Sequence, residues 1–217
     1  MIYADCGNTA VKLRHGDERV RLCADEVPAW LLRHPAKVLV LLPSASATAQ
    51  IVRDAWPGTL REVGVHLHLP DRGQYPSMGL DRIVAGLAAG PGTIVVDAGT
   101  ATTLTAWDGA GRFAGGLILP GPHAMIAGLC ARAPALPLVE PLLHDAAAAQ
   151  RDTRGAIAAG AGIGHAGMIV WCVAQLQRET GLDRVITTGA GAADLPLPSA
   201  VQRPWLVLDG LERLSAG

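Results

Sequence analysis

The sequence contains few aromatic and few charged side chains, and neither sign of charge is in excess. Aromatic residues make up 4% and charged residues 17% of its 217 residues, and 18 basic side chains against 19 acidic ones give a formal net charge of −1. The lack of a basic excess argues against binding to nucleic acid or to an anionic membrane surface. Half of the chain is hydrophobic (50%) and 26 residues are glycine. This composition predicts a compact soluble protein with an ample core, built as one large domain or two small ones.

Closely spaced cysteines are also lacking, and we expect no signal peptide. Cys6, Cys23, Cys130 and Cys172 are scattered, and no two of them form a Cys-x-x-Cys pair. Such spacing is typical of reduced thiols, which favours a cytoplasmic protein. The N-terminus enters an apolar strand at once and meets Asp5, unlike a signal peptide.

One segment is long and apolar enough to raise the alternative of a membrane span. Residues 155–177 carry no charged side chain, and Gly160 and Gly164 form a Gly-x-x-x-Gly pattern. The segment is mostly glycine and alanine, contains His165 and Gln175, and stands alone, so a buried helix is the favoured interpretation. Its face of small residues is expected to pack against another helix. A second subunit is one source of that helix, so we expect a homodimer.

Two related phrases carry the main functional signal, Asp5-Cys6-Gly7-Asn8-Thr9 and Asp97-Ala98-Gly99-Thr100-Ala101. Each follows one apolar run and precedes another, which predicts strand, tight turn and strand. Glycine lets the backbone approach a phosphate, successive N–H groups then face the anion, and a carboxylate can hold a cation beside it. A single Asp-x-Gly is an ordinary hairpin turn. Two such turns in matching positions predict two half-sites for one nucleotide.

The pattern of the two halves predicts a duplicated α/β architecture. The first half reads as strands near 1–5, 10–14, 19–23, 37–42 and 63–69, with helices near 27–33, 45–55 and 79–90. The second half reads as strands near 93–97, 101–107, 113–119, 184–187 and 205–208, with helices near 121–130, 152–178 and at the C-terminus. We therefore expect an N-terminal lobe of residues 1–91 and a C-terminal lobe of residues 92–217. Two such ribonuclease H-like halves with the active site between them are the architecture of actin, sugar kinases and heat-shock chaperone ATPases.

The sequence resembles the type III pantothenate kinases, bacterial members of that superfamily, over nearly its whole length. The resemblance is carried by the two turns and by Gly79-Leu80-Asp81-Arg82, Gly115-Gly116-Leu117-Ile118-Leu119-Pro120-Gly121, Thr153 before a glycine-rich helix, and Thr188-Gly189. The Gly-x-Asp-Arg phrase between the turns is its specific part, because the turns alone identify only the superfamily.

This resemblance implies an ATP-dependent kinase that converts pantothenate to 4'-phosphopantothenate, the first step of coenzyme A biosynthesis. It implies Mg²⁺ with ATP, a monovalent cation (K⁺ or NH₄⁺), and a homodimer in which Thr153 reaches pantothenate near the subunit interface. Asp81 takes the place of the general base, and Asp97 that of the monovalent-cation ligand. The implied ATP-binding residues are Asp5, Cys6, Gly7, Asn8, Thr9, Ala10, Val11, Lys12 and Thr100. The implied substrate-binding residues are Tyr75, Gly79, Leu80, Asp81, Arg82 and Thr153.

The residues alone leave alternatives open. Asp81 in the first turn of a helix would complement the helix dipole without any catalytic role, and Lys12 could be a solvated strand lysine. Arg82 in the same first turn opposes the dipole, and this local misfit favours function. Its guanidinium could bind a substrate carboxylate or hold Asp81 in position. Two alternative functions are a kinase of another small hydroxy acid and a non-catalytic relative that binds nucleotide or pantothenate.

Overall fold

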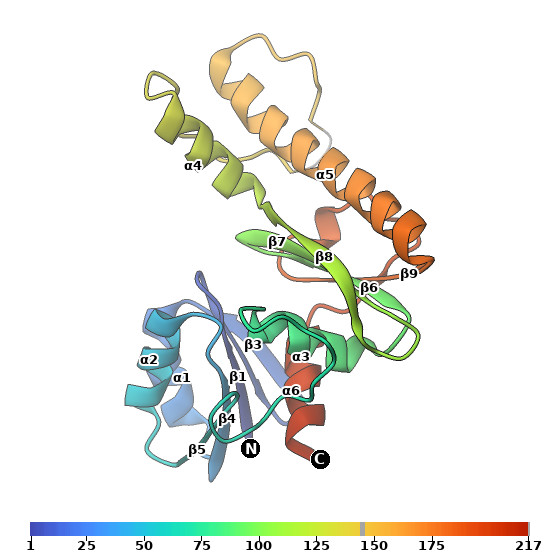
Figure 1. Cartoon of the computed structure of the whole chain (residues 1–217). Coiled ribbons are helices and arrows are strands. Elements are labelled where there is room, and N and C mark those ends of the chain that lie inside the picture. Colours follow the sequence, from blue (N-terminus) through green and yellow to red (C-terminus); the bar gives the residue numbers. More distant parts are fainter. Residues whose placement is uncertain (144–145, 217) are drawn as a thin grey trace. The chain divides into compact units, whose positions relative to one another are not determined.

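The computed structural model describes residues 1–143 and 146–216, and the chain forms two compact units (Figure 1). The first unit contains Met1–Pro91, Gly111–Phe113 and Trp205–Gly217, and the second contains Gly92–Ala110 and Ala114–Pro204. Each unit holds one five-stranded sheet. The chain is therefore of the α/β class, with one sheet in each unit.

The first sheet has the strand order β3-β2-β1-β4-β5. Its central strand β1 pairs antiparallel with β2 and parallel with β4. The strands are β1 (Ile2–Cys6), β2 (Val11–His15), β3 (Glu18–Leu22), β4 (Val38–Leu42) and β5 (Thr59–Glu62). Because side chains alternate between the faces of a strand, Ile2, Ala4 and Cys6 of β1 all face one side. They are fully buried in a core with residues of two helices, α1 (Val27–Arg33) and α2 (Ser46–Ala55).

Two further helices of the first unit pack against each other. They are α3 (Leu80–Ala89) and α6 (Leu206–Ala216), and a short 3₁₀ helix, η1 (Ala24–Glu26), precedes α1. Gly210 of α6 lies so close to the carbonyl oxygen of Val84 that a side chain at this position would collide with it. α6 also contacts the first sheet, where the Tyr3 hydroxyl and the Ser215 hydroxyl are hydrogen-bonded at 3.2 Å.

The second sheet repeats the first. Its strand order, read from the β8 edge, is β8-β7-β6-β9-β10. If its strands are counted from one in chain order, this is third, second, first, fourth and fifth, the same order as in the first sheet. The central strand β6 pairs antiparallel with β7 and parallel with β9, as β1 does with β2 and β4. The strands are β6 (Thr93–Ala98), β7 (Ala101–Trp107), β8 (Phe113–Pro120), β9 (Arg184–Thr188) and β10 (Val201–Gln202). The same topology built twice is evidence of an internal duplication.

A long helix, α5 (Thr153–Thr180), covers one face of the second sheet. Its residues Ile169, Cys172, Val173 and Leu176 share a core with strand residues such as Val96. A shorter helix, α4 (Pro122–Arg132), packs against α5, and η2 (Ala192–Asp194) follows β9. By length and composition α5 is apolar enough to cross a membrane, but one such helix is weak evidence because a soluble core helix passes the same test. Its core contacts favour the packed helix that the sequence indicates.

Three expectations differ from the structure. The strand expected near 63–69 is wrong: β5 ends at Glu62, whose carbonyl accepts the amides of Val65, His66 and Leu67 in a tight turn. The strand expected near 205–208 is the start of α6, because a run of four apolar residues has no visible period. The second unit also ends at Pro204 rather than at residue 217, because α6 packs on α3 of the first unit.

Candidate active site

The first glycine turn joins β1 to β2 and is fixed by the start of α2. The amide of Gly7 donates to the carbonyl of Ala10 at 3.1 Å and closes the turn. The amide of Ala45 donates to the carbonyl of Cys6 at 2.7 Å, and the Thr48 hydroxyl donates to the carbonyl of Gly7 at 2.9 Å. These bonds occupy the carbonyl groups of Cys6, Gly7 and Ala10. Asn8 and Thr9 at its tip remain exposed.

The charges of this turn are paired inside the first unit. Asp5 is only 5% exposed, and the Lys12 ammonium lies 3.3 Å from its Oδ2 atom. Asp5 and Lys12 are direct cross-strand partners, and the Ser44 hydroxyl donates to Asp5 Oδ1 at 3.3 Å. A buried carboxylate needs such a partner, because an unpaired buried charge is costly. Lys12 is therefore not a simple solvated lysine: its side chain is 19% exposed and faces the turn's carboxylate.

Cys6 is a buried filler within the same turn. Its side chain is 0% exposed and belongs to the core beneath the sheet. Burial raises the pKa of the Cys6 thiol far above its ordinary value, and the neighbouring Asp5 charge raises it further. The thiol is therefore uncharged near neutral pH and is a poor nucleophile.

The second glycine turn joins β6 to β7 and is held by hydrogen bonds from distant backbone amides. The amide of Gly99 donates to the carbonyl of Ala101 at 3.2 Å, and the amide of Gly121 donates to the carbonyl of Thr100 at 3.0 Å. Gly121 precedes α4, and a side chain there would collide with the carbonyl oxygens of Gly99 and Thr100. The amide of Gly191 donates to the carbonyl of Ala98 at 3.0 Å. The turn therefore depends on glycine at a position distant in the sequence.

One hydrogen bond holds the same place in the two turns, although their closing bonds span three residues in the first turn and two in the second. Ala45 is the third residue after β4, which ends at Leu42, and it donates to Cys6. Gly191 is the third residue after β9, which ends at Thr188, and it donates to Ala98. Since β4 and β9 hold the same place in the two sheets, the duplication extends to individual bonds of the turns.

Asp97 lies at the end of β6 beside two residues of β9. It pairs in register with Thr188, so both side chains point to the same face of the sheet. Gly189 has a φ of 90° and lies so close to the Asp97 carboxylate that a side chain could not be placed there. The Thr188 hydroxyl is buried and has no hydrogen-bond partner among the described residues. An unsatisfied buried hydroxyl beside a carboxylate can serve as an oxygen ligand for a cation.

Asp81 lies in the first turn of α3. Its Oδ1 atom accepts the backbone amide of Arg82 at 2.9 Å. Burial raises the pKa of the Asp81 carboxyl, and the nearby negative charge of Asp5 raises it further, while the bond from the Arg82 amide opposes the shift. A side chain at Gly79 would meet Asp81 Oδ1, so glycine at the start of the helix makes room for this carboxylate. A half-buried carboxylate with a raised pKa suits a general base.

Arg82 and Tyr75 form a second pair at the same helix start. Arg82 is 6% exposed, and its Nη1 atom donates to the Tyr75 hydroxyl oxygen at 2.8 Å. Because this bond uses the phenolic oxygen as an acceptor, the proton of Tyr75 can be donated to another group. Tyr75 is 39% exposed. A guanidinium and a phenol held together can bind a carboxylate or hydroxyl of a small molecule.

The sequence-predicted residues fall into two groups. Within the first unit are the Asp5–Lys12 turn, Tyr75 and the helix start Gly79–Arg82; within the second are Asp97, Thr100 and Thr153. Thr153 is the exposed first residue of α5, whose N-cap Asp152 accepts the amide of Gly155 at 2.8 Å. Sequence reasoning missed Ser44 and Thr48, which are hydrogen-bonded to the first turn, and Phe113, whose ring packs against Tyr75. The position after β4 that holds Ser44 carries no Gly-rich phrase like the one after β9, so only the sheet topology reveals it.

Two sheets of one topology, each with an Asp-x-Gly turn between its first two strands, define the duplicated actin-like ATPase fold. Two solved structures agree with the fold alone. One is a conserved protein from Campylobacter jejuni that is assigned to the Baf family (TM-score 0.69, 18% identity, 100% of this chain and 98% of that one). The other is the ethanolamine utilization protein EutJ from Carboxydothermus hydrogenoformans (TM-score 0.51, 12% identity, 97% of this chain and 88% of that one).

Sequence comparison identifies the family. Residues 40–175 match the family model of type III pantothenate kinase. A type III pantothenate kinase of Desulfovibrio desulfuricans is 32% identical over 99% of this chain and 95% of its own length. The enzyme of Synechococcus elongatus is 32% identical over 87% of this chain and 77% of its own length. The enzyme of Streptomyces avermitilis is 36% identical over 71% of this chain and 63% of its own length. The chain belongs to the type III pantothenate kinase family, whose members phosphorylate pantothenate in coenzyme A biosynthesis.

Proposed function

We propose that Asp81 is the general base of this kinase and that Arg82 and Tyr75 bind the carboxylate of pantothenate. The observation that carries the proposal is the helix start at Gly79, which holds a carboxylate with a raised pKa next to an arginine–tyrosine pair. Asp81 Oδ1 already accepts an amide, so Oδ2 is the atom we assign to the primary hydroxyl of the substrate. Gly79 and Leu80 supply the backbone of this substrate-binding segment.

Asp81 acts in the proposal mainly by positioning. Phosphoryl transfer has a loose transition state, so alignment of the hydroxyl and neutralisation of charge contribute more than basicity. As the oxygen of pantothenate bonds to the γ-phosphorus and the bond to ADP breaks, the hydroxyl proton passes to Asp81. The raised pKa makes the carboxylate a better acceptor at this moment than an ordinary aspartate.

The turn residues are assigned to ATP. In the first unit these are Asp5, Cys6, Gly7, Asn8, Thr9, Ala10, Val11 and Lys12, and in the second unit Thr100. The support is that the tips of both turns are exposed while their flanking carbonyls are occupied by Ala45, Thr48, Gly121 and Gly191. Outward N–H groups and hydroxyls can then bind phosphate oxygens. Mg²⁺, which accompanies ATP in kinases, would supply further neutralisation of the phosphate charge.

Asp97 is assigned to a monovalent cation, K⁺ or NH₄⁺. The unsatisfied Thr188 hydroxyl beside Asp97 supports this assignment, because oxygen atoms are the ligands such ions prefer. We expect the substitution Asp97→Asn to raise the K⁺ concentration needed for half-maximal activity by ~10-fold or more. Thermal stabilisation by added K⁺, compared with Na⁺, provides a readout besides activity. Unchanged K⁺ dependence in both measurements would refute the assignment.

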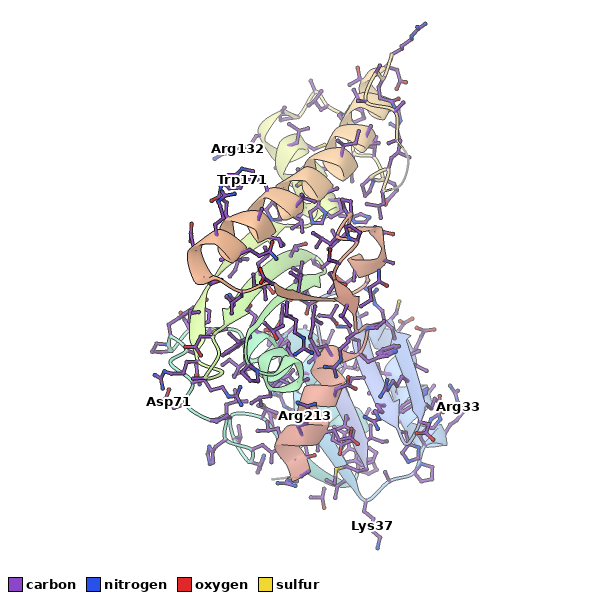
Figure 2. The ribbon with its side chains drawn as sticks, turned by 90° about the vertical axis from the view of Figure 1, so that its right-hand side faces the viewer. Arg33, Lys37, Asp71, Arg132, Trp171 and Arg213 are labelled. Atoms are coloured by element: carbon purple, nitrogen blue, oxygen red, sulfur yellow. The ribbon has the colours of Figure 1, made fainter. Side chains whose placement is uncertain are left out.

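A homodimer through α5 is the proposed assembly. Ile163, Val170 and Trp171 lie at helical spacing on one face of α5 and are 43%, 40% and 63% exposed. Trp171 projects away from the helix (Figure 2). An exposed apolar face that also contains Gly167 allows close approach of a second copy of the same helix. Thr153 on α5 is then the residue that would contact pantothenate near the interface.

Light scattering tests the assembly. The wild-type chain should have the mass of a dimer, and Trp171→Glu should lower it to that of a monomer. Leu32→Glu, at an apolar position of α1 that is even more exposed than Trp171, should leave the dimer intact. A wild-type monomer at working concentration would remove the proposal.

An ADP-release assay with ATP and pantothenate, run in K⁺ and in Na⁺ buffer, tests the function as a whole. We expect pantothenate-dependent ADP release that requires K⁺ and a divalent cation. We also expect the enzyme to reside in the cytoplasm. ADP release that is insensitive to pantothenate, from folded protein, would contradict the assignment of the substrate residues.

A further inference from the structure

The tip of the hairpin between β7 and β8 belongs to the first unit. This tip is Gly111–Phe113, which includes the first residue of β8, whereas β7 and the rest of β8 belong to the second unit. The amide of Phe113 donates to the carbonyl of Arg72 at 2.7 Å, and Arg72 Nη1 donates to the carbonyl of Gly111 at 3.4 Å. Gly111 has a φ of 74°, a left-handed conformation that favours glycine. One backbone hydrogen bond and one side-chain hydrogen bond therefore join the hairpin tip to the segment that precedes Tyr75.

Phe113 forms a three-membered cluster with Tyr75 and Arg82. The rings of Phe113 and Tyr75 meet edge to face, with centroids 5.7 Å apart and an interplanar angle of 66°. The guanidinium carbon of Arg82 lies 6.0 Å from the centre of the Phe113 ring. The third contact in the cluster is the 2.8 Å hydrogen bond that Arg82 donates to the Tyr75 hydroxyl oxygen. Each member thus contacts the other two.

The cluster matters because Tyr75 lies in a segment without regular secondary structure. No helix or strand covers residues 68–79, and the amide of Met78 donates to the carbonyl of Tyr75 at 3.0 Å in a local turn. A tyrosine on such a segment loses side-chain entropy when it binds a ligand, and so does an arginine at the adjacent helix start. An aromatic ring packed against both restricts their rotamers before the ligand arrives.

We propose that Phe113 is a positioning residue that holds Tyr75 and Arg82 in the geometry for binding pantothenate. This inference rests on the proposed function of those two residues. Phe113 itself need not touch the substrate. It is the chain's single phenylalanine, so no other phenylalanine can take its place.

Steady-state kinetics of two Phe113 variants test the proposal. Phe113→Leu keeps much of the volume but removes the ring, and it should raise KM for pantothenate by ~5- to 20-fold, with kcat and KM for ATP changed by less than about 2-fold. Phe113→Tyr keeps the ring, so its KM for pantothenate should stay within about 2-fold of the wild-type value. Leu32→Ala, which truncates an exposed apolar side chain in the same unit, should change none of these constants.

Thermal unfolding separates positioning from a purely structural role. If Phe113→Leu lowers Tm but leaves KM for pantothenate within about 2-fold of wild type, Phe113 only anchors the hairpin, and the proposal is overturned. If both aromatic and aliphatic variants raise KM for ATP and pantothenate alike, the defect is general and the proposal also fails.

Arg82→Lys distinguishes failure of this inference from failure of the proposed function. If Arg82→Lys leaves KM for pantothenate unchanged, the substrate role of Arg82 is wrong. If Arg82→Lys raises that KM while Phe113→Leu does not, only the positioning role is wrong. If Phe113 acts through Arg82, the double variant should raise KM by less than the product of the two single effects.

Discussion

Arg82 donates a 2.8 Å hydrogen bond to the hydroxyl oxygen of Tyr75, seven residues earlier in the chain. A positive charge in the first turn of a helix is unfavourable for the dipole, and Arg82 is nearly fully buried as well. The phenol and the ring of Phe113 offset part of this cost. The adjacent Asp81 is favourable for the dipole but carries a raised pKa. Arg82 therefore conflicts with the helix dipole, and Asp81 conflicts with its buried, negatively charged surroundings. Such local conflicts are typical of a functional site.

The activity should have an acid limb set by Asp81. The base must be ionised, and burial together with the Asp5 charge keeps it protonated to a higher pH than an ordinary aspartate, whose pKa is about 3.9. The logarithm of kcat/KM for pantothenate should therefore fall as pH decreases through this raised pKa. In Asp5→Asn, loss of the negative charge should move the limb to lower pH, whatever its effect on ATP. A limb that stays at the same pH would show that the two carboxylates are not coupled.

Gly121→Ala should damage the second turn. The added methyl group would meet the carbonyl oxygens of Gly99 and Thr100, so the turn or the start of α4 must shift. We expect a loss of about 1–3 kcal/mol in the free energy of unfolding and a rise in KM for ATP. Gly128→Ala is the matched control. Gly128 lies within α4, the helix that Gly121 precedes, and nothing lies within 4 Å of the carbon that the substitution adds there. That control should be neutral or stabilising by up to about 1 kcal/mol. Equal unfolding midpoints and equal KM values for the two variants would contradict the packing argument.

Stability should decrease in mild acid because of His165. This residue of α5 is buried, its Nε2 atom lies 2.9 Å from the Thr102 hydroxyl oxygen, and burial lowers the pKa of its imidazole. The unfolded chain binds a proton at about pH 6.5, whereas the folded chain does so only at lower pH. The stabilisation is therefore present above pH ~6.5 and is lost as pH falls through the folded pKa, with a slope of at most about 1.4 kcal/mol per pH unit.

Urea unfolding at pH 7 and pH 5 measures this effect. His165→Gln should reduce the pH dependence of the unfolding free energy. His123→Gln, at an exposed histidine of α4 paired with Glu140, should alter it much less. An unchanged pH dependence in His165→Gln would assign the acid sensitivity to other groups.

The sequence could predict the parts of the site that depend on local chemistry. Both Asp-x-Gly turns lie between strands as expected, and α3 begins at Leu80 after Gly79, as the Gly-Leu-Asp-Arg phrase indicates. These features need only a few adjacent residues, so the pattern is readable. The actin-like fold follows from two such turns and the alternation of strands and helices.

Other features depend on contacts between distant segments. The bond from Ala45 to Cys6 and its equivalent from Gly191 to Ala98 come from parallel strand pairing, which no local pattern specifies. The contact of Phe113 with Tyr75 joins a hairpin tip to an irregular segment. Leu206 begins a helix although its short apolar run is equally consistent with a strand. In each case tertiary packing decides what the sequence leaves open.

The most direct test of the account is the turnover of Asp81→Asn at saturating ATP and pantothenate, with ATP binding and Tm measured on the same sample. The account predicts a fall in kcat by ~10²–10⁴, because the hydroxyl loses the group that orients it and accepts its proton. It also predicts retained ATP binding and a Tm at neutral pH no lower than wild type, since a carboxyl with a raised pKa destabilises the folded state when it ionises. Turnover close to that of wild type in the folded variant would contradict the role of Asp81.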